Sequence, residues 1–204
     1  ALARLFPELD QLFGVPQRPE YHPEIDTGLH TMMVLDQATR LTKDNRIRFA
    51  AVMHDLGKGC TPKHLLPRHH GHEQRGVTLV RELCQRLRIP NEFRDLAILV
   101  TRFHGHCHKA NELNPKTLLV TLNELDAFRR PTRFEQFLMA CKADALGRKG
   151  AENNAYPQAD VFREARQAAI SVNSKALIEQ GYKGVALGEE LQRQRLRAIS
   201  ALRH

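Results

Sequence analysis

Apolar side chains recur at helical spacing along most of this chain. In Ile25–Leu41 they stand three and four positions apart, which is the pattern of an amphipathic helix. The same period predicts further helices, which cover residues 45–54, 73–88, 92–104, 116–128, 131–145, 160–178 and 189–203. No strand-like alternation of apolar and polar residues continues over several positions. The pattern therefore predicts an all-α protein.

Polar residues, glycines and prolines separate the predicted helices. Asp44 is a candidate N-cap, and Pro115 suits the first turn of a helix. Residues 60–71 contain two prolines, a glycine and several histidines, so we expect a loop there. A polar break follows residue 150. We therefore expect a helical bundle domain over residues 1–150 and a C-terminal helical extension over residues 151–204.

Composition places the chain among ordinary globular proteins. It has 204 residues, of which 42% are hydrophobic and 26% charged, enough to bury a core without disulfides. No apolar run is long enough to predict a membrane-spanning helix. The first residues show neither an initiator Met nor a signal-peptide layout, which favours a processed or excised piece of a longer chain. The four cysteines form no C-x-x-C pair, so we expect a reduced, cytoplasmic protein.

Charge adds a hypothesis about partners. Lys and Arg number 31 against 23 Asp and Glu, which gives a net charge of +8. An excess of this size favours contact with a polyanion such as nucleic acid. The alternative is a cationic surface that serves only solubility.

Histidines and aspartates supply the candidate chemistry. Eight of the eleven histidines fall between His54 and His108. The pair His54–Asp55 ends an apolar helix in FAAVMHDLGKG, where the imidazole could also serve simply as a helix C-cap. His30 and Asp144 stand on the apolar faces of two other helices. Buried imidazoles and carboxylates need partners, and one shared divalent metal would satisfy all four side chains.

The order of these residues resembles a known signature. His30, His54–Asp55 and Asp144 are similar to the H…HD…D set of HD-domain metal-dependent phosphohydrolases, which hold a divalent metal in a helical bundle. HDLGKG, HHGHEQRG, VTRFHGHCH and FREARQAA…GYKGVALGEELQRQRLRAI together resemble the C-terminal half of bacterial CCA-adding tRNA nucleotidyltransferases of the multifunctional type. The resemblance spans essentially the whole chain. The D-x-D motif of the polymerase domain does not occur here, so CCA addition is not expected of this segment.

The resemblance implies roles residue by residue. By this resemblance, the metal ligands are His30, His54, Asp55 and Asp144. The catalytic residues are Asp55 and His54. A second metal or the substrate phosphate would meet His72, His104 and Lys58, with Arg75 assigned only because it is nearby in sequence. We expect solvated positions for His69, His70, His106 and His108, and assign no role to His22 and His64.

The resemblance also implies an activity and a cofactor. The cofactor is a divalent ion (Ni, Mg or Mn), with its identity and the choice between one ion and two left open. The expected activities are 2′,3′-cyclic phosphodiesterase, 2′-nucleotidase and phosphatase, serving tRNA 3′-end maturation and repair. The expected partners are tRNA and RNA ends that carry a phosphate or a 2′,3′-cyclic phosphate. We expect no membrane partner, and we leave open whether the protein forms a homodimer.

A basic tail completes the sequence. The glycines at 181, 184 and 188 predict a turn before the last helix, on which Arg193, Arg195 and Arg197 lie. The resemblance implies that these arginines contact tRNA. Without the resemblance, a series of charged residues on a helix more often forms a face that is exposed to solvent and has no partner. Two other functions therefore compete with the hydrolase: a non-catalytic tRNA-binding helical module, and an HD nucleotidase for small nucleotides.

Overall fold

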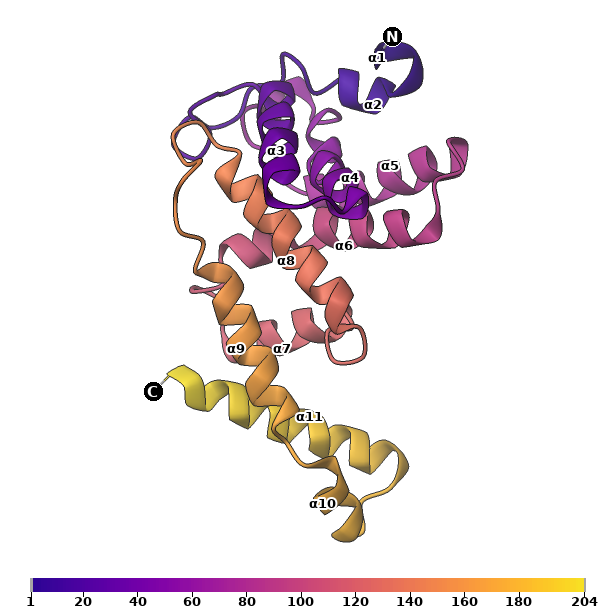
Figure 1. Ribbon diagram of the computed structural model, residues 1–204, viewed down its shortest axis with the longest axis vertical. Helices are drawn as coiled ribbons and strands as arrows, with labels where there is room; N and C mark the ends of the chain where they lie inside the picture. Colours follow the sequence, from indigo (N-terminus) through magenta and orange to yellow (C-terminus); the bar gives the residue numbers. More distant parts are fainter. Residues whose placement is uncertain (1, 204) are drawn as a thin grey trace. The chain divides into compact units, whose positions relative to one another are not determined.

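The structure, a computed structural model that describes residues 2–203, confirms the all-α prediction (Figure 1). Within that range the only β-type pairing is an isolated bridge between Pro16 and Asp26. In chain order the helices are α1 (Leu2–Leu5), α2 (Pro7–Asp10), α3 (Thr27–Leu41), α4 (Asn45–Met53), η1 (Leu56–Lys58), η2 (Lys63–Leu65), α5 (His72–Arg86), α6 (Asn91–His108), α7 (Pro115–Glu124), α8 (Pro131–Leu146), α9 (Gln158–Ile170), α10 (Ser174–Glu179), α11 (Gly184–Ser200) and η3 (Ala201–Arg203). Over the described range, every helix falls short of the length and apolarity needed to cross a bilayer.

Side-chain caps explain where several helices begin. The Asp44 carboxylate accepts a hydrogen bond from the Arg46 N–H, which confirms it as the N-cap of α4. It also accepts a bond from Gln136 Nε2 at 2.7 Å and so ties α4 to α8. Asn114 caps α7 in the same way, and Pro115 occupies the first helical turn as predicted.

The chain divides into two compact units, whose composition differs from the predicted boundary at residue 150. The first unit comprises Ala1–His108 and Glu135–Tyr156, and the second comprises Lys109–Phe134 and Pro157–His204. Residues 109–134 group with the C-terminal helices because α7 packs against both α9 and α11. The predicted extension at 151–204 is therefore only part of a larger helical unit.

Several predicted helix boundaries were wrong; α7, for example, ends at Glu124 and not at residue 128. The helix predicted over 160–178 is interrupted, because the Asn173 side chain accepts from two N–H groups and starts the separate helix α10. The last helix begins at Gly184, so Gly188 lies inside α11 and not in the preceding turn. Helix α6 continues to His108, beyond its predicted end at residue 104.

One part of the core of the first unit lies where α3, α4 and α8 meet. It is a set of fully buried residues, namely Val34, Ala38, Ala51 and Ala143. Small side chains allow the helices to approach closely. Gly147, just after α8, extends this contact, because a Cβ there would lie 2.6 Å from Val34 Cγ2. The close approach of α3 and α8 brings His30 and Asp144 into one layer.

The second unit has its own apolar core. Helices α7, α9, α10 and α11 pack against one another in this unit. Fully or almost fully buried side chains fill the space between them, including Leu118, Leu122, Phe134, Phe162, Ala165, Leu177 and Ile199. Burying each large apolar side chain contributes about 1.5–3 kcal/mol to the stability of the fold. The C-terminal helices are therefore part of a packed unit and do not form an isolated tail.

Candidate metal centre

The four predicted metal ligands come together in the first unit. His30 lies on α3, His54 and Asp55 at the end of α4, and Asp144 on α8. His30 Nε2 lies 3.1 Å and His54 Nε2 3.6 Å from the same oxygen, Asp144 Oδ1. His54 Nε2 is also 3.1 Å from Asp55 Oδ2, and all four side chains are buried. Four positions that are distant in sequence therefore form one polar cluster inside a helical core.

Asp55 links this cluster to a second one. Its other oxygen, Oδ1, lies 3.3 Å from His72 Nε2 on α5 and 3.6 Å from His104 Nε2 on α6. The ligand atoms of Asp55, His72 and His104 lie within 4.8 Å of one another, as do those of His30, His54 and Asp144. Each group has the composition and spacing of a metal-ion site, and the two groups are adjacent.

Backbone carbonyls orient three of the imidazole rings. The Nδ1 atoms of His54, His72 and His104 each lie within hydrogen-bond distance of a main-chain oxygen: Ala51 O at 2.6 Å, His69 O at 2.8 Å and Val100 O at 3.1 Å, respectively. Each ring therefore donates through Nδ1 and directs Nε2 at the carboxylates. For His54, the contact with the last turn of α4 and the contact with the cluster coexist, so the C-cap alternative and the ligand interpretation are compatible.

The buried charges of the cluster shift the pKa values of its members. Burial alone lowers the pKa of His30, but hydrogen bonds with Asp144 and Glu24 outweigh it and raise the pKa to about 9. Burial likewise opposes the ionisation of Asp55 and Asp144, yet the charge of His54 holds the pKa of both carboxyls well below the usual range. Protonated imidazoles thus balance the buried carboxylates, and a bound cation could replace those protons.

Buried polar atoms without a well-formed hydrogen bond converge on the same place. His30 Nδ1, His54 Nε2, Asp55 Oδ1 and His72 Nε2 are among them. An unsatisfied buried polar atom costs about 1–3 kcal/mol, so such a concentration needs an explanation. Imidazole nitrogens with carboxylate oxygens form a donor set that suits Mn, Fe, Co, Ni, Zn or Mg. The residues present therefore fit a divalent cation.

Lys58 and Arg75 occupy different environments beside the cluster. Lys58 Nζ donates to Gln17 Oε1 at 2.6 Å and lies 2.6 Å from Asp55 Oδ2, with only 9% of the side chain exposed. It therefore holds Asp55 directly. The Arg75 guanidinium donates to Gly57 O and to two acceptors in the 60–71 loop, which it braces.

Two histidines expected to be solvated are held by partners, so that expectation was wrong for them. His108 Nε2 lies 2.6 Å from Asp144 Oδ2, and its Nδ1 lies 3.0 Å from the Tyr156 hydroxyl. The extension of α6 causes this, because residues 104 and 108 share one helix face. His69 bridges Thr61 Oγ1 at 2.8 Å and Pro16 O at 3.0 Å. The i, i+4 histidine spacing was a signal that could have identified His108.

The other histidines divide by burial. His106 is half-buried beside the Phe103 ring, whereas His64 and His70 are exposed. His22, which had no predicted role, lies 3.1 Å through Nδ1 from Glu24 Oε1. The same Glu24 oxygen is 2.8 Å from His30 Nδ1. No helical spacing connects Glu24 to the signature, so the sequence pattern offered no signal for it.

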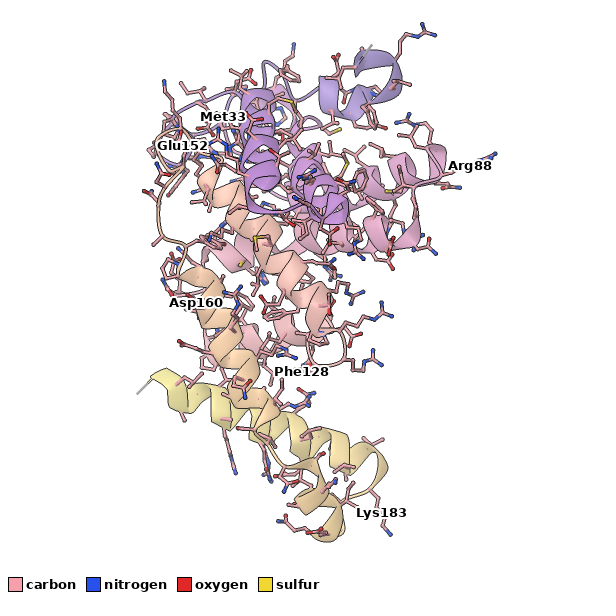
Figure 2. The ribbon with its side chains drawn as sticks, viewed as in Figure 1. Met33, Arg88, Phe128, Glu152, Asp160 and Lys183 are labelled. Carbon is pink, nitrogen blue, oxygen red and sulfur yellow. The ribbon has the colours of Figure 1, made fainter. Side chains whose placement is uncertain are left out.

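The three arginines predicted to bind tRNA are not equivalent. The Arg195 guanidinium packs over the Phe128 ring, 4.2 Å from its centroid, and is half-buried (Phe128 is labelled in Figure 2). Arg193 forms an ion pair with Glu190 on the same helix, and Arg197 is exposed. Arg195 therefore has a packing role within the second unit, whereas Arg193 and Arg197 present their side chains to solvent.

Comparisons with known proteins identify a family for this chain. Residues 27–130 match the family model described as HD domain. The chain is 58% identical over 203 residues to the Multifunctional CCA protein of Thioalkalivibrio sulfidiphilus (strain HL-EbGR7) and 56% identical over 204 residues to that of Nitrosococcus oceani. It is 55% identical over 204 residues to that of Methylococcus capsulatus. Each alignment covers 100% of this chain and 48–50% of the relative, so the chain spans about half the length of these curated relatives.

Proposed function

The chain belongs to the HD domain family, and from that premise we propose that it hydrolyses phosphate esters at a divalent-metal centre. The observation that carries the proposal is that His30, His54 and Asp144 converge inside the core and that Asp55 contacts His54, with ligand-capable atoms left unsatisfied. A helical core has no structural need for such a cluster, because apolar side chains of similar size would fill the space at lower cost.

The first cation would be held by His30, His54, Asp55 and Asp144. His72 and His104, which share Asp55 with that group, would hold a second cation or the substrate phosphate. When bound, a divalent ion lowers the pKa of coordinated water from about 15.7 towards 7 and neutralises charge on phosphoryl oxygens. Nickel, magnesium and manganese all accept such a mixed nitrogen and oxygen set.

The side chains of this protein supply the rest of the chemistry. Asp55 is held in place by Lys58 and His54, so its carboxylate is positioned beside the proposed cation, where it would orient an attacking water. Lys58 places a positive charge at the edge of the cluster, where it would meet a phosphate oxygen as a point charge. Burial lowers the pKa of His104 to about 3, which keeps this imidazole neutral at physiological pH and able to accept a hydrogen bond or bind a cation.

The substrate we propose is the 3′ end of tRNA, with a 2′,3′-cyclic phosphate or a 2′-phosphate. The relatives are called Multifunctional CCA proteins, and the CCA sequence forms the tRNA 3′ end. The net charge of +8 suits a polyanionic substrate. In the second unit, Arg193 and Arg197 are the arginines that we propose contact tRNA phosphates. A cytoplasmic location follows from this substrate, and the four free thiols are compatible with it.

The test is hydrolysis of 2′,3′-cyclic AMP and of 2′-AMP with added Ni²⁺, Mg²⁺ or Mn²⁺. His54→Ala and Asp55→Asn should each reduce turnover by about 100-fold or more. Asp36→Asn is the matched control, because it removes a carboxylate from an exposed position of α3. Full activity in both site variants would refute the assignment. Elemental analysis of unchelated protein identifies the ion.

The same proteins distinguish the hydrolase from the competing hypothesis of a non-catalytic tRNA-binding module. If tRNA binds tightly and in a salt-dependent way but no metal and no turnover are found, the histidine cluster is structural. A nucleotidase for small nucleotides would hydrolyse free nucleotides with no preference for RNA ends. Competition between cyclic AMP and a tRNA that ends in a cyclic phosphate distinguishes these two substrates.

A further inference from the structure

The segment Val15–Asp26 borders the metal centre and precedes the residues that match the HD family model. Its two ends are joined by backbone hydrogen bonds: Gln17 N donates to Ile25 O at 2.7 Å, and Thr27 N donates to Val15 O at 3.0 Å. These bonds close the segment into a compact loop directly before α3. The residues between the two ends are therefore held in place beside His30.

Glu24 is the residue of this segment that reaches the centre. Only 3% of its side chain is exposed, and Oε1 lies 2.8 Å from His30 Nδ1. Oε1 is also 3.1 Å from His22 Nδ1, while Oε2 accepts from the Lys149 N–H at 3.2 Å. Both carboxylate oxygens are thus engaged, so the position of Glu24 is determined from two sides.

His30 differs from the other imidazoles in how its ring is oriented. In His54, His72 and His104 the Nδ1 atom is hydrogen-bonded to a backbone carbonyl, whereas in His30 it lies 2.8 Å from a carboxylate oxygen, an ion-pair contact that lacks the angle of a well-formed hydrogen bond. The opposite ring atom, His30 Nε2, lies 3.1 Å from Asp144 Oδ1. A carboxylate at Nδ1 fixes the tautomer, aims Nε2 at the ligand position and makes it a better donor to a cation.

We infer that Glu24 is a positioning residue that orients His30 as a metal ligand, an inference that rests on the metal-dependent function proposed above. Glu24 acts through His30 and does not itself contact the reacting atoms. His22 supports Glu24 from the far side, with its ring edge-on to that of His30 at a centroid distance of 4.6 Å. The centre therefore extends beyond the family signature into the loop that precedes it.

The backbone beside Glu24 supports this assignment. Ile25 has φ +61°, a left-handed conformation that is strained for a β-branched residue. Ile25 is 48% exposed, so burial of its side chain does not explain the conformation. The turn does direct Glu24 inward and Ile25 outward, and it lets Ile25 O accept from Gln17 N. Strain of this kind is typical of positions where the chain orients a functional group.

The experiment measures the affinity of the full chain for Ni²⁺ and Mn²⁺ by calorimetry, independently of turnover. Glu24→Gln should weaken binding about 10- to 100-fold, and Glu24→Asp should restore part of the loss. Glu20→Gln is the matched control, because it neutralises a 61% exposed carboxylate in the same segment and should leave affinity unchanged. If Glu24→Gln folds poorly, it is repeated on an Ile25→Gly background, in which the left-handed turn is relaxed.

Two failures are distinguishable. If the wild-type chain binds neither ion, the proposed function fails, and the inference fails with it. If the wild-type chain binds metal and Glu24→Gln binds it equally well, only the role of Glu24 is overturned. Long-range ¹H–¹⁵N spectra of the histidine rings provide a second readout. They should show His30 protonated at Nδ1 in the metal-loaded wild type and a mixture of tautomers in loaded Glu24→Gln.

Discussion

Gly57→Ala should move the metal ligands apart without removing any of them. Gly57 lies in η1, between Asp55 and Lys58, at the point where η1 packs on the start of α5. A Cβ on Gly57 would stand 1.9 Å from the carbonyl oxygen of His72 and 2.6 Å from Gly76 N. Both atoms belong to the backbone of α5, so no side-chain rotation can relieve the overlap.

The size of the effect follows from these distances. Close carbon–oxygen contacts in proteins are about 3.3 Å, so η1 and α5 would need to separate by roughly 1.4 Å. Asp55 Oδ1 and His72 Nε2, which are 3.3 Å apart, lie on opposite sides of that contact. Overpacking of this kind costs about 1–3 kcal/mol of stability. A misplacement of about 1 Å can reduce turnover about 100-fold, so activity should fall further than stability does.

The assay compares Gly57→Ala with Gly59→Ala. A Cβ on Gly59 would lie 3.4 Å from Gln11 Cβ and from Leu12 Cδ2, so its neighbours need to move little, if at all. Chemical denaturation, metal calorimetry and cyclic-phosphate hydrolysis are measured for both variants. A Gly57→Ala protein with wild-type stability and wild-type metal affinity would refute the reasoning, because the contact between η1 and α5 would then not position the ligands.

Three further predictions rest on other contacts. Asp44→Ala should lower the free energy of unfolding by about 1–2 kcal/mol, since it removes a helix cap. Hydrogen bonds from Arg46 lower the pKa of Asp44 from 3.8 to about 2, so its contribution should be complete above about pH 4 and lost as the pH falls through 2. Denaturation curves of both proteins across that range test the sign. In the metal-free chain the pKa of His30 is raised to about 9, so binding a cation at pH 7 should release a proton. Affinity should therefore increase with pH up to about 9, and calorimetry in buffers of different ionisation enthalpy counts the protons; a flat pH profile would contradict the ligand role of His30. Arg197→Ala should reduce the salt dependence of tRNA binding by about one unit of log–log slope with no loss of stability. Arg195→Ala should instead destabilise the second unit by about 1 kcal/mol, because its guanidinium packs on an aromatic ring; the reverse pattern in melting and binding data would show that the two roles are exchanged.

Local signals in the sequence predicted the helices and several of their ends well. Caps and first-turn prolines act through neighbours only a few residues away, as at Asp44 and Pro115. The break between α9 and α10 was missed because the apolar period continues across it, while the Asn173 side chain bonds to the backbone and starts a new helix. Competition between such a cap and a continuous helix is decided by packing, which the periodicity does not report.

The candidate site shows the same division. The order of His30, His54–Asp55 and Asp144 marked four side chains that need a shared partner when buried, and the structure brings them together. The residues that support these ligands were not identified from the sequence pattern. His108 joins Asp144 only because α6 is longer than predicted, and Glu24 meets His30 only because a strained turn directs it inward.

Residue order and composition alone determined that the chain is helical, that it is basic and that it carries a metal-type ligand set. These properties depend on side-chain chemistry and on contacts between near neighbours, which are written in the linear order. Tertiary structure alone decided which imidazole nitrogen faces which carboxylate oxygen, and that α7 groups with the C-terminal helices. Those outcomes depend on how closely the helices approach and how far each one extends, and both are set by packing across the whole core.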